Sequence, residues 1–547
     1  MRFLIFQLIS VMTRFILLAA LPAMLVACSK APETVAVPPA QTASPVATVA
    51  HASIDWVKPD GASLDAVFAD AKANNKPVFL YWGAVWCPPC NQIKATVFNR
   101  PDFVERSKGF IPVYLDGDTP GAQKLGAQFK VRGYPTTILF KPDGIELTRL
   151  PGEVDAVQYM RILKLGMNST QPIKETLTAA LAAPGGSAPG LTADAWNMLA
   201  YYAWDTDESQ LLEKKDLSQT VQILAKSCPP EFSDAATRLL LRAVVIAGQE
   251  KAKGLDTASA LVAVQKVLAD AAQARASADI VVNYATDLVT ALTATPGPER
   301  IAFLTTLNTA LDRLSNDPAL SKADQLGAVQ AKVALAQMDL PKADKPGLSP
   351  ELMAQVQAAV SKADLTTTDK YERQAIIPSA AHLLTEAGLS DASDAMLQAE
   401  LPKAVSGYYH MLVLASNAKR RGDKAASLDW SEKAYVGSLG PATRLQWGSG
   451  YVNKLIELSP QDSARIEKAA SQVIGELDAA PETFYERNRR SLEKMGTQLT
   501  KWNANGKNAA VLKKLTAQLN GICTKLPEAD SARGACSGVF GKAGKKA

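Results

Sequence analysis

Cys87 and Cys90 stand two residues apart in the stretch YWGAVWCPPCNQI, after an apolar run and before a segment of helical character. This spacing is compatible with a dithiol that exchanges with disulfides, with half of a four-cysteine zinc site, or with a pair of inert thiols. A cysteine at a helix N-terminus faces unpaired N–H groups and the positive end of the helix dipole, which stabilise a thiolate. Cys87 is therefore placed to act as the nucleophile, and Cys90, one turn later, to resolve a mixed disulfide.

The remaining cysteines argue against the zinc interpretation. Cys523 and Cys536 lie far from the pair along the chain and lack the close spacing of a zinc knuckle, and the chain has only three histidines. We therefore expect no metal and no other cofactor. In an oxidising compartment we expect Cys523 and Cys536 to close a structural disulfide, which leaves Cys228 unpaired.

The elements that must position the dithiol alternate between helical and strand patterns from Ile54 to about Gly166. We expect helices over 63–75, from Cys87 through Val97, over 100–107 and 120–130, and from about 153, and strands over 76–82, 110–116, 134–140 and 145–150. This order of elements predicts an α/β thioredoxin fold, a central mixed sheet flanked by helices, over residues 54–167.

Two motifs and one longer segment carry a family resemblance. WCPPC resembles the active-site motif of the thioredoxin superfamily, and GYPT resembles its cis-proline motif. The segment VFNRPDFVERSKGFIPVYLDGD is similar to the C-terminal periplasmic domain of DsbD-type thiol:disulfide interchange proteins. The resemblance covers about a fifth of the chain.

The resemblance implies a site, an activity and partners. Cys87 would be the nucleophile, Cys90 the resolving cysteine and Pro135 a cis-proline that shapes the substrate site. The residues implied to bind substrate are Trp86, Tyr134 and Thr136. The substrates would be protein dithiols and disulfides, the redox partner a transmembrane protein of DsbD type, and the favoured direction reduction, with oxidation or isomerisation close behind.

One position departs from the family pattern. The superfamily usually carries a buried carboxylate six residues before the first cysteine, where it accepts the proton of the second cysteine, and this chain has Tyr81 there. Asp116 and Glu146 are the candidates to replace it.

The N-terminus predicts export and lipid attachment. Phe15–Ala27 has the length and small-residue ending of a signal-peptide core, so residues 1–27 are expected to be a signal sequence. LVAC, ending at Cys28, resembles a bacterial lipobox; the alternative is a signal peptide cleaved elsewhere. Residues 28–53 would then be a lipidated cysteine and an Ala/Pro tether. We expect a periplasmic lipoprotein, attached to the outer rather than the inner membrane because Ser29 follows the cysteine.

From 172 to 547 the sequence is rich in Ala and Leu and predicts helices. Tyr408 to Gly437 resembles a tetratricopeptide-type helical hairpin, which indicates either a divergent helical-repeat array or an irregular helical domain. The tryptophans of this region are expected to fill its core; they are Trp196, Trp204, Trp430 and Trp447.

Two functions remain open at this point. The first is a membrane-anchored thiol:disulfide oxidoreductase, and the alternative is a scaffold or assembly lipoprotein whose dithiol is a redox sensor or vestigial. A net charge of +5 over 547 residues, without a basic run interleaved with aromatics, argues against nucleic-acid binding.

Overall fold

The computed structural model describes residues 53–541 except 60–62, 120, 132, 153, 183–189, 207–209, 213–215, 253, 294 and 342–346. The predicted signal sequence, Cys28 and nearly all of the predicted tether lie outside the described residues. Among the residues described, no helix is long and apolar enough to cross a membrane.

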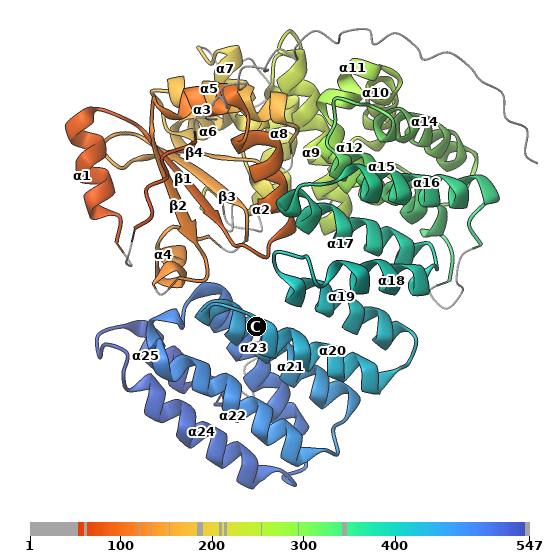
Figure 1. Ribbon diagram of the computed structural model, residues 1–547. Coiled ribbons are helices and arrows are strands. Elements are labelled where there is room, and N and C mark those ends of the chain that lie inside the picture. Colours follow the sequence, from red (N-terminus) through yellow and green to blue (C-terminus); the bar gives the residue numbers. More distant parts are fainter. Residues whose placement is uncertain are drawn as a thin grey trace, which may run out of the picture. The chain divides into compact units, whose positions relative to one another are not determined.

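The N-terminal part contains a four-stranded mixed sheet, as predicted (Figure 1). Its strands are β1 (Val78–Gly83), β2 (Ile111–Asp116), β3 (Thr136–Phe140) and β4 (Glu146–Leu150), in the order β2-β1-β3-β4. β2 runs parallel to β1, whereas β3 and β4 are antiparallel to their neighbours. Every residue of β1 is buried, as its continuous apolar run predicts for a central strand.

Helices flank this sheet close to the predicted positions. They are α1 (Asp65–Asn74), α2 (Pro88–Ile93), α3 (Pro101–Ser107), α4 (Ala122–Gln128) and α5 (Ala156–Asn168), with α2 continuing as the π-helical turn η1 (Lys94–Phe98). The thioredoxin-like fold predicted from the sequence is therefore confirmed.

Successive residues of β1 enter two different cores, because side chains alternate across a strand. Leu80 and Trp82 pack in a core confined to the thioredoxin-like part. Phe79 and Tyr81 belong to a second core, which includes both cysteines of the dithiol and continues into the helical region. The dithiol thus lies on the face of the sheet that the helical region covers.

The rest of the described chain is helical, as predicted. Its elements are α6 (Ile173–Leu181), α7 (Ala193–Ala200), η2 (Trp204–Thr206), α8 (Leu217–Ser227), α9 (Ser233–Glu250), α10 (Thr257–Ala269), α11 (Ala271–Ala276), α12 (Ala278–Asn283), α13 (Ala285–Leu292), α14 (Pro298–Ser315), α15 (Lys322–Gln337), α16 (Pro350–Thr366), α17 (Lys370–Glu386), α18 (Ser390–Glu400), α19 (Gly407–Arg420), α20 (Lys424–Gly437), α21 (Pro441–Leu458), α22 (Ser463–Ala479), η4 (Pro481–Thr483), α23 (Glu486–Trp502), α24 (Ala509–Cys523) and α25 (Ser531–Ser537).

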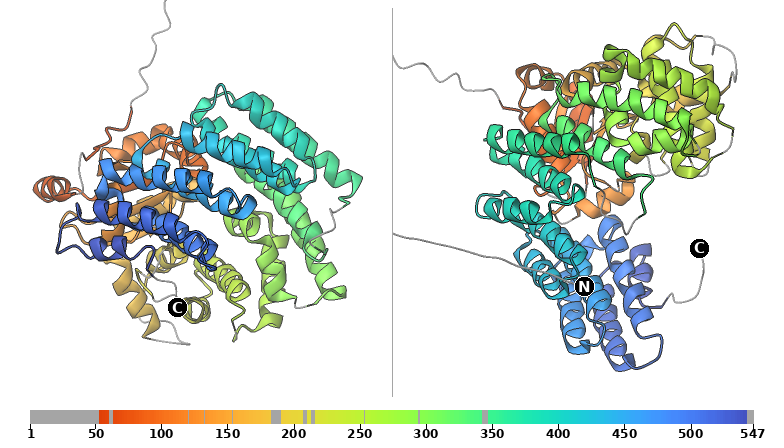
Figure 2. Two further views of the ribbon diagram at one scale, coloured as in Figure 1. Left: turned by 90° about the horizontal axis from the view of Figure 1, so that it is seen from below. Right: turned by 90° about the vertical axis from the view of Figure 1, so that its right-hand side faces the viewer.

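From α14 onward, most helices contact the next helix and several contact the one after it, as in stacked helical hairpins (Figure 2). α19 and α20 form the hairpin expected at Tyr408 to Gly437, and Gly422 supplies the positive φ of its turn. The tetratricopeptide likeness itself stays a prediction.

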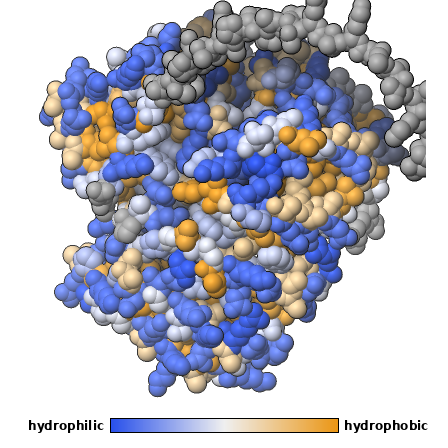
Figure 3. Space-filling model, viewed as in Figure 1, coloured by the Kyte–Doolittle hydropathy of each residue, from blue (hydrophilic) through white to orange (hydrophobic). Residues whose placement is uncertain are grey.

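Two parts of the helical region return to the thioredoxin-like part. α17 packs on α2, which carries the dithiol, and α23 packs on α4 (Figure 1). On the face drawn in Figure 3, hydrophilic residues predominate and hydrophobic ones form small separate groups. Both cysteines of the dithiol lie in the buried core that the thioredoxin-like part shares with the helical region.

Candidate functional site

The two cysteines form a disulfide at the start of α2. Cys87 is the N-cap residue, in extended conformation, and its Sγ accepts a hydrogen bond from the backbone N–H of Cys90 at 3.2 Å. Pro88 and Pro89 occupy the first turn, where a missing N–H costs the helix no internal hydrogen bond. A thiolate at Cys87 would lie at the positive end of α2, which is the position that lowers a thiol pKa.

Two buried side chains fix the shape of the dithiol loop. Asn91, fully buried, donates from Nδ2 to the carbonyl oxygens of Val85 at 2.7 Å and Cys87 at 3.0 Å. Tyr81 donates from its hydroxyl to the carbonyl oxygen of Cys90 at 3.3 Å. Both contacts hold backbone on either side of the disulfide.

A cis peptide bond joins Tyr134 to Pro135 directly before β3. β1 and β3 pair with Trp82 opposite Thr136, so the end of β1 that leads to the dithiol lies beside this loop. Gly152 packs on the proline so closely that an added Cβ would lie 3.1 Å from Pro135 Cγ. The structure therefore brings the predicted dithiol and the predicted cis-proline to the same edge of the sheet.

Tyr134 and Thr136, both predicted to bind substrate, have internal partners. The Tyr134 hydroxyl accepts a hydrogen bond from Gln123 Nε2 at 2.8 Å, and a Cβ on Gly117 would collide with this hydroxyl. Thr136 is buried and donates to the carbonyl oxygen of Gly133. Their side chains shape the loop from within.

Tyr81 occupies the position at which the family usually has a buried carboxylate. Tyr81 is fully buried, stacks on Tyr114 and has a pKa raised well above its ordinary value by burial. Of the two predicted substitutes, Asp116 lies opposite Gly83, at the end of β1 that leads to the dithiol. Glu146 lies opposite Phe140, at the other end of β3, and is paired with Arg149. Asp116 is therefore the candidate that the fold places near the dithiol.

Burial raises the pKa of Asp116, which keeps this carboxyl closer to the pH range of proton transfer. Lys94, on the turn that follows α2, opposes this shift by its charge and lies 5.1 Å from the ring centre of Tyr114. The pKa of Lys94 itself is lowered by burial. Asp116 and Lys94 are thus both half-buried and interact through their charges.

Trp86, directly before Cys87, is held by the helical region. Its indole N–H donates to Thr443 Oγ1 of α21 at 2.8 Å. Its ring packs against Trp447 of α21, with ring centres 4.7 Å apart, and stacks on Tyr409 of α19 at 6.0 Å. Trp447 is buried, as expected, and the core that it fills also contains the dithiol loop, which Trp447 contacts directly.

Thr443 also binds the loop after β2. Its backbone N–H donates to Asp118 Oδ1 at 2.7 Å, and its hydroxyl donates to the same oxygen. Burial raises the pKa of Asp118 to about 6, and the hydrogen bond from the Thr443 side chain opposes this rise. One threonine thus joins Trp86 to Asp118, on two separate loops of the thioredoxin-like part.

Arg487 completes the enclosure from α23. Its guanidinium carbon lies 4.8 Å from the ring centre of Tyr134 and 5.8 Å from that of Trp86. Burial lowers the pKa of Arg487. The result is a dithiol with little solvent exposure: 2% for Cys87, 0% for Cys90 and 7% for Trp86.

The other cysteines behave differently from the pair in α2. A second disulfide joins Cys523, the last residue of α24, to Cys536 in α25. Cys228 is free and buried, and burial raises the pKa of its thiol to about 12. In the part of the chain that the structure describes, no group of three or more His, Cys, Asp or Glu side chains is placed to hold a metal ion.

Sequence reasoning missed several residues of this site. Asn91 could have been noticed, because it is a polar residue inside an otherwise apolar helix start. Asp118 stood in the segment that carried the resemblance, but nothing marked its role. Thr443 and Trp447 had no detectable signal, because they lie more than 300 positions from the dithiol along the chain.

Comparison with known proteins agrees with the fold. Residues 64–166 match the family model described as a thioredoxin-like domain. Thioredoxin of Mycobacterium tuberculosis is 34% identical over 100 residues, which are 18% of this chain and 82% of that protein. Thiol:disulfide interchange protein DsbD 2 of Pseudomonas aeruginosa is 35% identical over 122 residues, which are 22% of this chain and 20% of that protein. DsbD of Pseudomonas fluorescens is 33% identical over 116 residues, 20% of each chain.

The match is therefore to one domain, and the chain spans about a fifth of the length of the DsbD proteins. A solved circular tandem repeat protein aligns with 68% of this chain and 78% of its own at 14% identity, with a TM-score of 0.14. Through residues 64–166 the chain belongs to the thioredoxin family. A Cys-X-X-Cys disulfide at the N-terminus of α2 in this fold supports a thiol–disulfide oxidoreductase.

Proposed function

We propose that this protein is a periplasmic, membrane-anchored thiol:disulfide oxidoreductase that acts on protein disulfides, preferentially as a reductase. The observation that carries the proposal is the Cys87–Cys90 disulfide at a helix N-terminus beside a cis-proline. Lipid attachment at Cys28 and an outer-membrane location rest on the sequence pattern alone. The helical region would select or position the partners.

The proposed reaction transfers two electrons to the substrate. The Cys87 thiolate attacks one sulfur of a substrate disulfide, the substrate S–S bond breaks, and the released substrate sulfur takes up a proton. Cys90 then loses its proton and attacks Cys87 Sγ, which releases the second substrate sulfur and leaves the Cys87–Cys90 disulfide. Asp116 is the proposed acceptor of the Cys90 proton, directly or through water.

The names of the similar proteins support the direction and the partner. The similarity to DsbD proteins, named for thiol:disulfide interchange, favours a dithiol that receives electrons from a transmembrane protein of DsbD type. Gln123 donates a hydrogen bond to the Tyr134 hydroxyl, and Tyr134 precedes the cis bond to Pro135. In this position the backbone of Tyr134 would form hydrogen bonds with a substrate strand.

The first experiment is the reduction potential of the Cys87–Cys90 pair, measured in glutathione buffers on the chain carrying Cys28→Ala. We expect a value near about −270 mV, the range of thioredoxin. A value near about −120 mV, the range of DsbA, would contradict the reducing direction. Peptide mapping of the same samples distinguishes the redox state of Cys87–Cys90 from that of Cys523–Cys536.

The second experiment is a trapping assay on the same chain. We expect Cys90→Ser to accumulate mixed disulfides through Cys87 when it is reacted with a disulfide-bonded protein such as insulin, whereas Cys87→Ser accumulates none. Equal trapping by both variants would contradict the assigned roles.

The alternative is a scaffold lipoprotein whose dithiol is a redox sensor. Two observations favour it: the enclosed dithiol and Tyr81 in place of the family carboxylate. Insulin reduction separates the two functions, because a sensor would fold normally and change redox state without sustained turnover.

A further inference from the structure

We propose that the helical region is an intramolecular cover of the dithiol, so that exchange with protein partners is limited by release of Trp86 from α21 and α19. The inference deepens the proposed function and rests on it. Its basis is the enclosure of both cysteines by helices that lie 280 or more positions further along the chain.

The helical region blocks the approach of a second protein to the dithiol sterically. In thiol–disulfide exchange the attacking thiolate must reach a sulfur of the disulfide. When the thiolate belongs to a partner protein, the backbone of that partner must also come close to the disulfide. Cys87, 2% exposed, and Cys90, 0% exposed, leave no room for a second protein chain. A protein partner can therefore react only after the covering helices move.

The covering helices contact residues that were expected to bind substrate. Trp86 and Tyr134 are residues that the family resemblance assigned to substrate, and here they contact the protein's own side chains. Trp86 packs against Trp447 and Tyr409, and Arg487 lies over Tyr134. The cover thus occupies the surface that an incoming protein would use.

Among the described residues, few hydrogen bonds hold Trp86 in place. Besides the aromatic pairs, Gln374 Nε2 of α17 donates to the Trp86 carbonyl oxygen at 3.4 Å. Thr443 supplies the hydrogen bonds to Trp86 and Asp118. Each such bond contributes about 1 kcal/mol net, so removing two of them shifts an opening equilibrium roughly tenfold or more.

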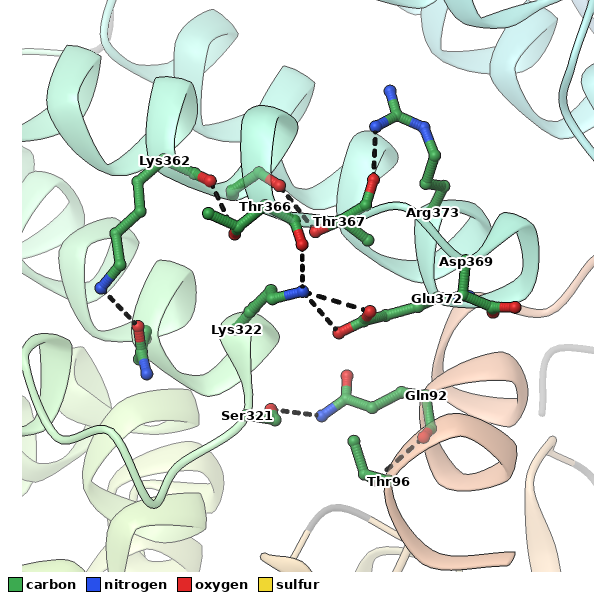
Figure 4. A network of polar contacts seen from close by, with 12 residues as sticks. Gln92, Thr96, Ser321, Lys322, Lys362, Thr366, Thr367, Asp369, Glu372 and Arg373 are labelled. Atoms are coloured by element: carbon green, nitrogen blue, oxygen red, sulfur yellow. Dashed lines mark hydrogen bonds and ion pairs between the residues drawn. The ribbon is translucent and has the colours of Figure 1, made fainter. Parts of the chain in front are cut away.

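A second, polar contact lies at the other end of α2. Gln92 Nε2 donates to Ser321 Oγ, the N-cap of α15, at 2.9 Å (Figure 4). Next to it, Lys322 Nζ donates to the Thr366 carbonyl oxygen and pairs with Glu372, so α15, α16 and α17 are tied together at this point. This end of α2 therefore meets a group of helices that are bonded to one another, whereas at the Trp86 end α21 contributes the Thr443 hydroxyl and the Trp447 ring.

A cavity of about 240 Å³ lies beside the Gln92 contact. Pro88, Pro89 and Gly152 line it from the thioredoxin-like part, and Asp324 and Ala375 line it from α15 and α17. Because the prolines between the two cysteines face this cavity, a small thiol has a shorter path to the dithiol than a protein does. Small and protein dithiols should therefore differ in their sensitivity to the cover.

Two glycines provide a matched test of the cover. Gly440, the N-cap of α21, has φ +84° and a Cβ added there would lie 2.6 Å from Asp118 Cβ. Gly422, in the turn between α19 and α20, has φ +80° and open space around it. Alanine strains the backbone at both positions. Only at Gly440 does the added Cβ also collide with the thioredoxin-like part, which would push α21 away from it.

The experiment measures how fast Cys87–Cys90 is reduced in the full chain carrying Cys28→Ala. The probes are dithiothreitol and a reduced small thioredoxin, with acid quenching, alkylation and peptide mass spectrometry. We expect Gly440→Ala to speed reduction by the protein dithiol at least fivefold and to change dithiothreitol reduction less, while Gly422→Ala leaves both rates unchanged.

A second pair of variants tests the proposal if Gly440→Ala misfolds. Thr443→Val removes the hydroxyl that contacts Trp86 and Asp118, and we expect roughly tenfold faster reduction by the protein dithiol. Thr305→Val is the control, because the Thr305 hydroxyl donates to the carbonyl oxygen of Ile301 in its own helix.

Equal rates in the wild type and in both opening variants would overturn the proposal, as would a parallel rise at Cys523–Cys536, which would indicate general unfolding. Failure of the proposed function is read separately. If the opening variants react quickly with thioredoxin but never turn over insulin, the cover stands and the oxidoreductase function fails.

Discussion

At the scale of single residues, Tyr81 decides how the dithiol is supported. A family carboxylate is replaced by an aromatic residue that packs between Tyr114 and Phe98 and reaches the Cys90 carbonyl oxygen with its hydroxyl. The position has become part of the hydrophobic core, so proton transfer must use another group.

Substitution of Tyr81 tests whether this residue supports the core rather than proton transfer. We expect Tyr81→Phe to cost about 1 kcal/mol of unfolding free energy, the worth of one hydrogen bond, and to leave the exchange rate unchanged. Tyr81→Asp should cost several kcal/mol, because it leaves a cavity and a buried carboxyl without restoring a fitted site. Denaturant unfolding and insulin turnover of both variants check this, and faster turnover by Tyr81→Asp would contradict it.

His410 gives the molecule a pH response at the residue scale. It is fully buried on α19, and burial lowers its pKa to about 4, with Glu400 opposing the shift and Arg373 adding to it. Because the folded protein binds this proton less readily than the unfolded chain, stability is present above pH 6.5 and is lost as the pH falls toward 4.

We expect this loss to reach about 2 kcal/mol between pH 7 and pH 5. The measurement is the urea midpoint at both pH values for the wild type and for His410→Gln, which cannot titrate. The wild type should lose more stability than the variant over this interval. Parallel behaviour of the two proteins would show that His410 does not carry the effect.

At the scale of elements, the C-terminal helices depend on a covalent link. α25 has seven residues, too few to be stable alone, and the Cys523–Cys536 disulfide fixes it to α24. Cys536, Val539 and Phe540 then enter the core that contains α23.

Removing this disulfide should cost about 3 kcal/mol, the value for closing a loop of this length. We expect the double variant Cys523→Ala and Cys536→Ala to lose hydrogen-exchange protection over 531–540 first. Cys228→Ala, which removes a buried thiol outside any disulfide, is the matched control and should have a smaller effect. Equal effects of the two changes would argue against a role for the cross-link.

At the scale of the whole molecule, the thioredoxin-like part and the helical region share a core. One continuous cluster joins Phe79 of β1 and both cysteines of the dithiol to Leu445 of α21 and Leu492 of α23. A separate cluster lies among the helices from α9 to α15 and includes Leu311. Loss of packing at α21 should therefore reach the sheet.

We expect Leu445→Ala, a fully buried truncation worth about 2–5 kcal/mol, to reduce the hydrogen-exchange protection of β1 together with that of α21. Leu311→Ala removes the same atoms from the other core and should affect β1 less. If Leu445→Ala leaves β1 unchanged while α21 opens, the two parts unfold independently.

The sequence by itself determined the secondary-structure elements and those functional residues that short-range sequence patterns identify. The buried run of β1, the cysteines at the start of α2 and the proline before β3 each follow from periodicity, helix-end chemistry and motif spacing. For the same reason, the thioredoxin-like fold and the helical character of the remainder could be predicted from the sequence.

Only the tertiary structure decided what surrounds the dithiol. Thr443, Trp447 and Arg487 reach it from helices hundreds of positions away, and Asp116 was separated from Glu146 by strand register rather than by residue type. Such contacts depend on how helices stack over many turns, and no local periodicity records that. The sequence therefore indicated a dithiol, and the packing of the whole chain determined that it is covered.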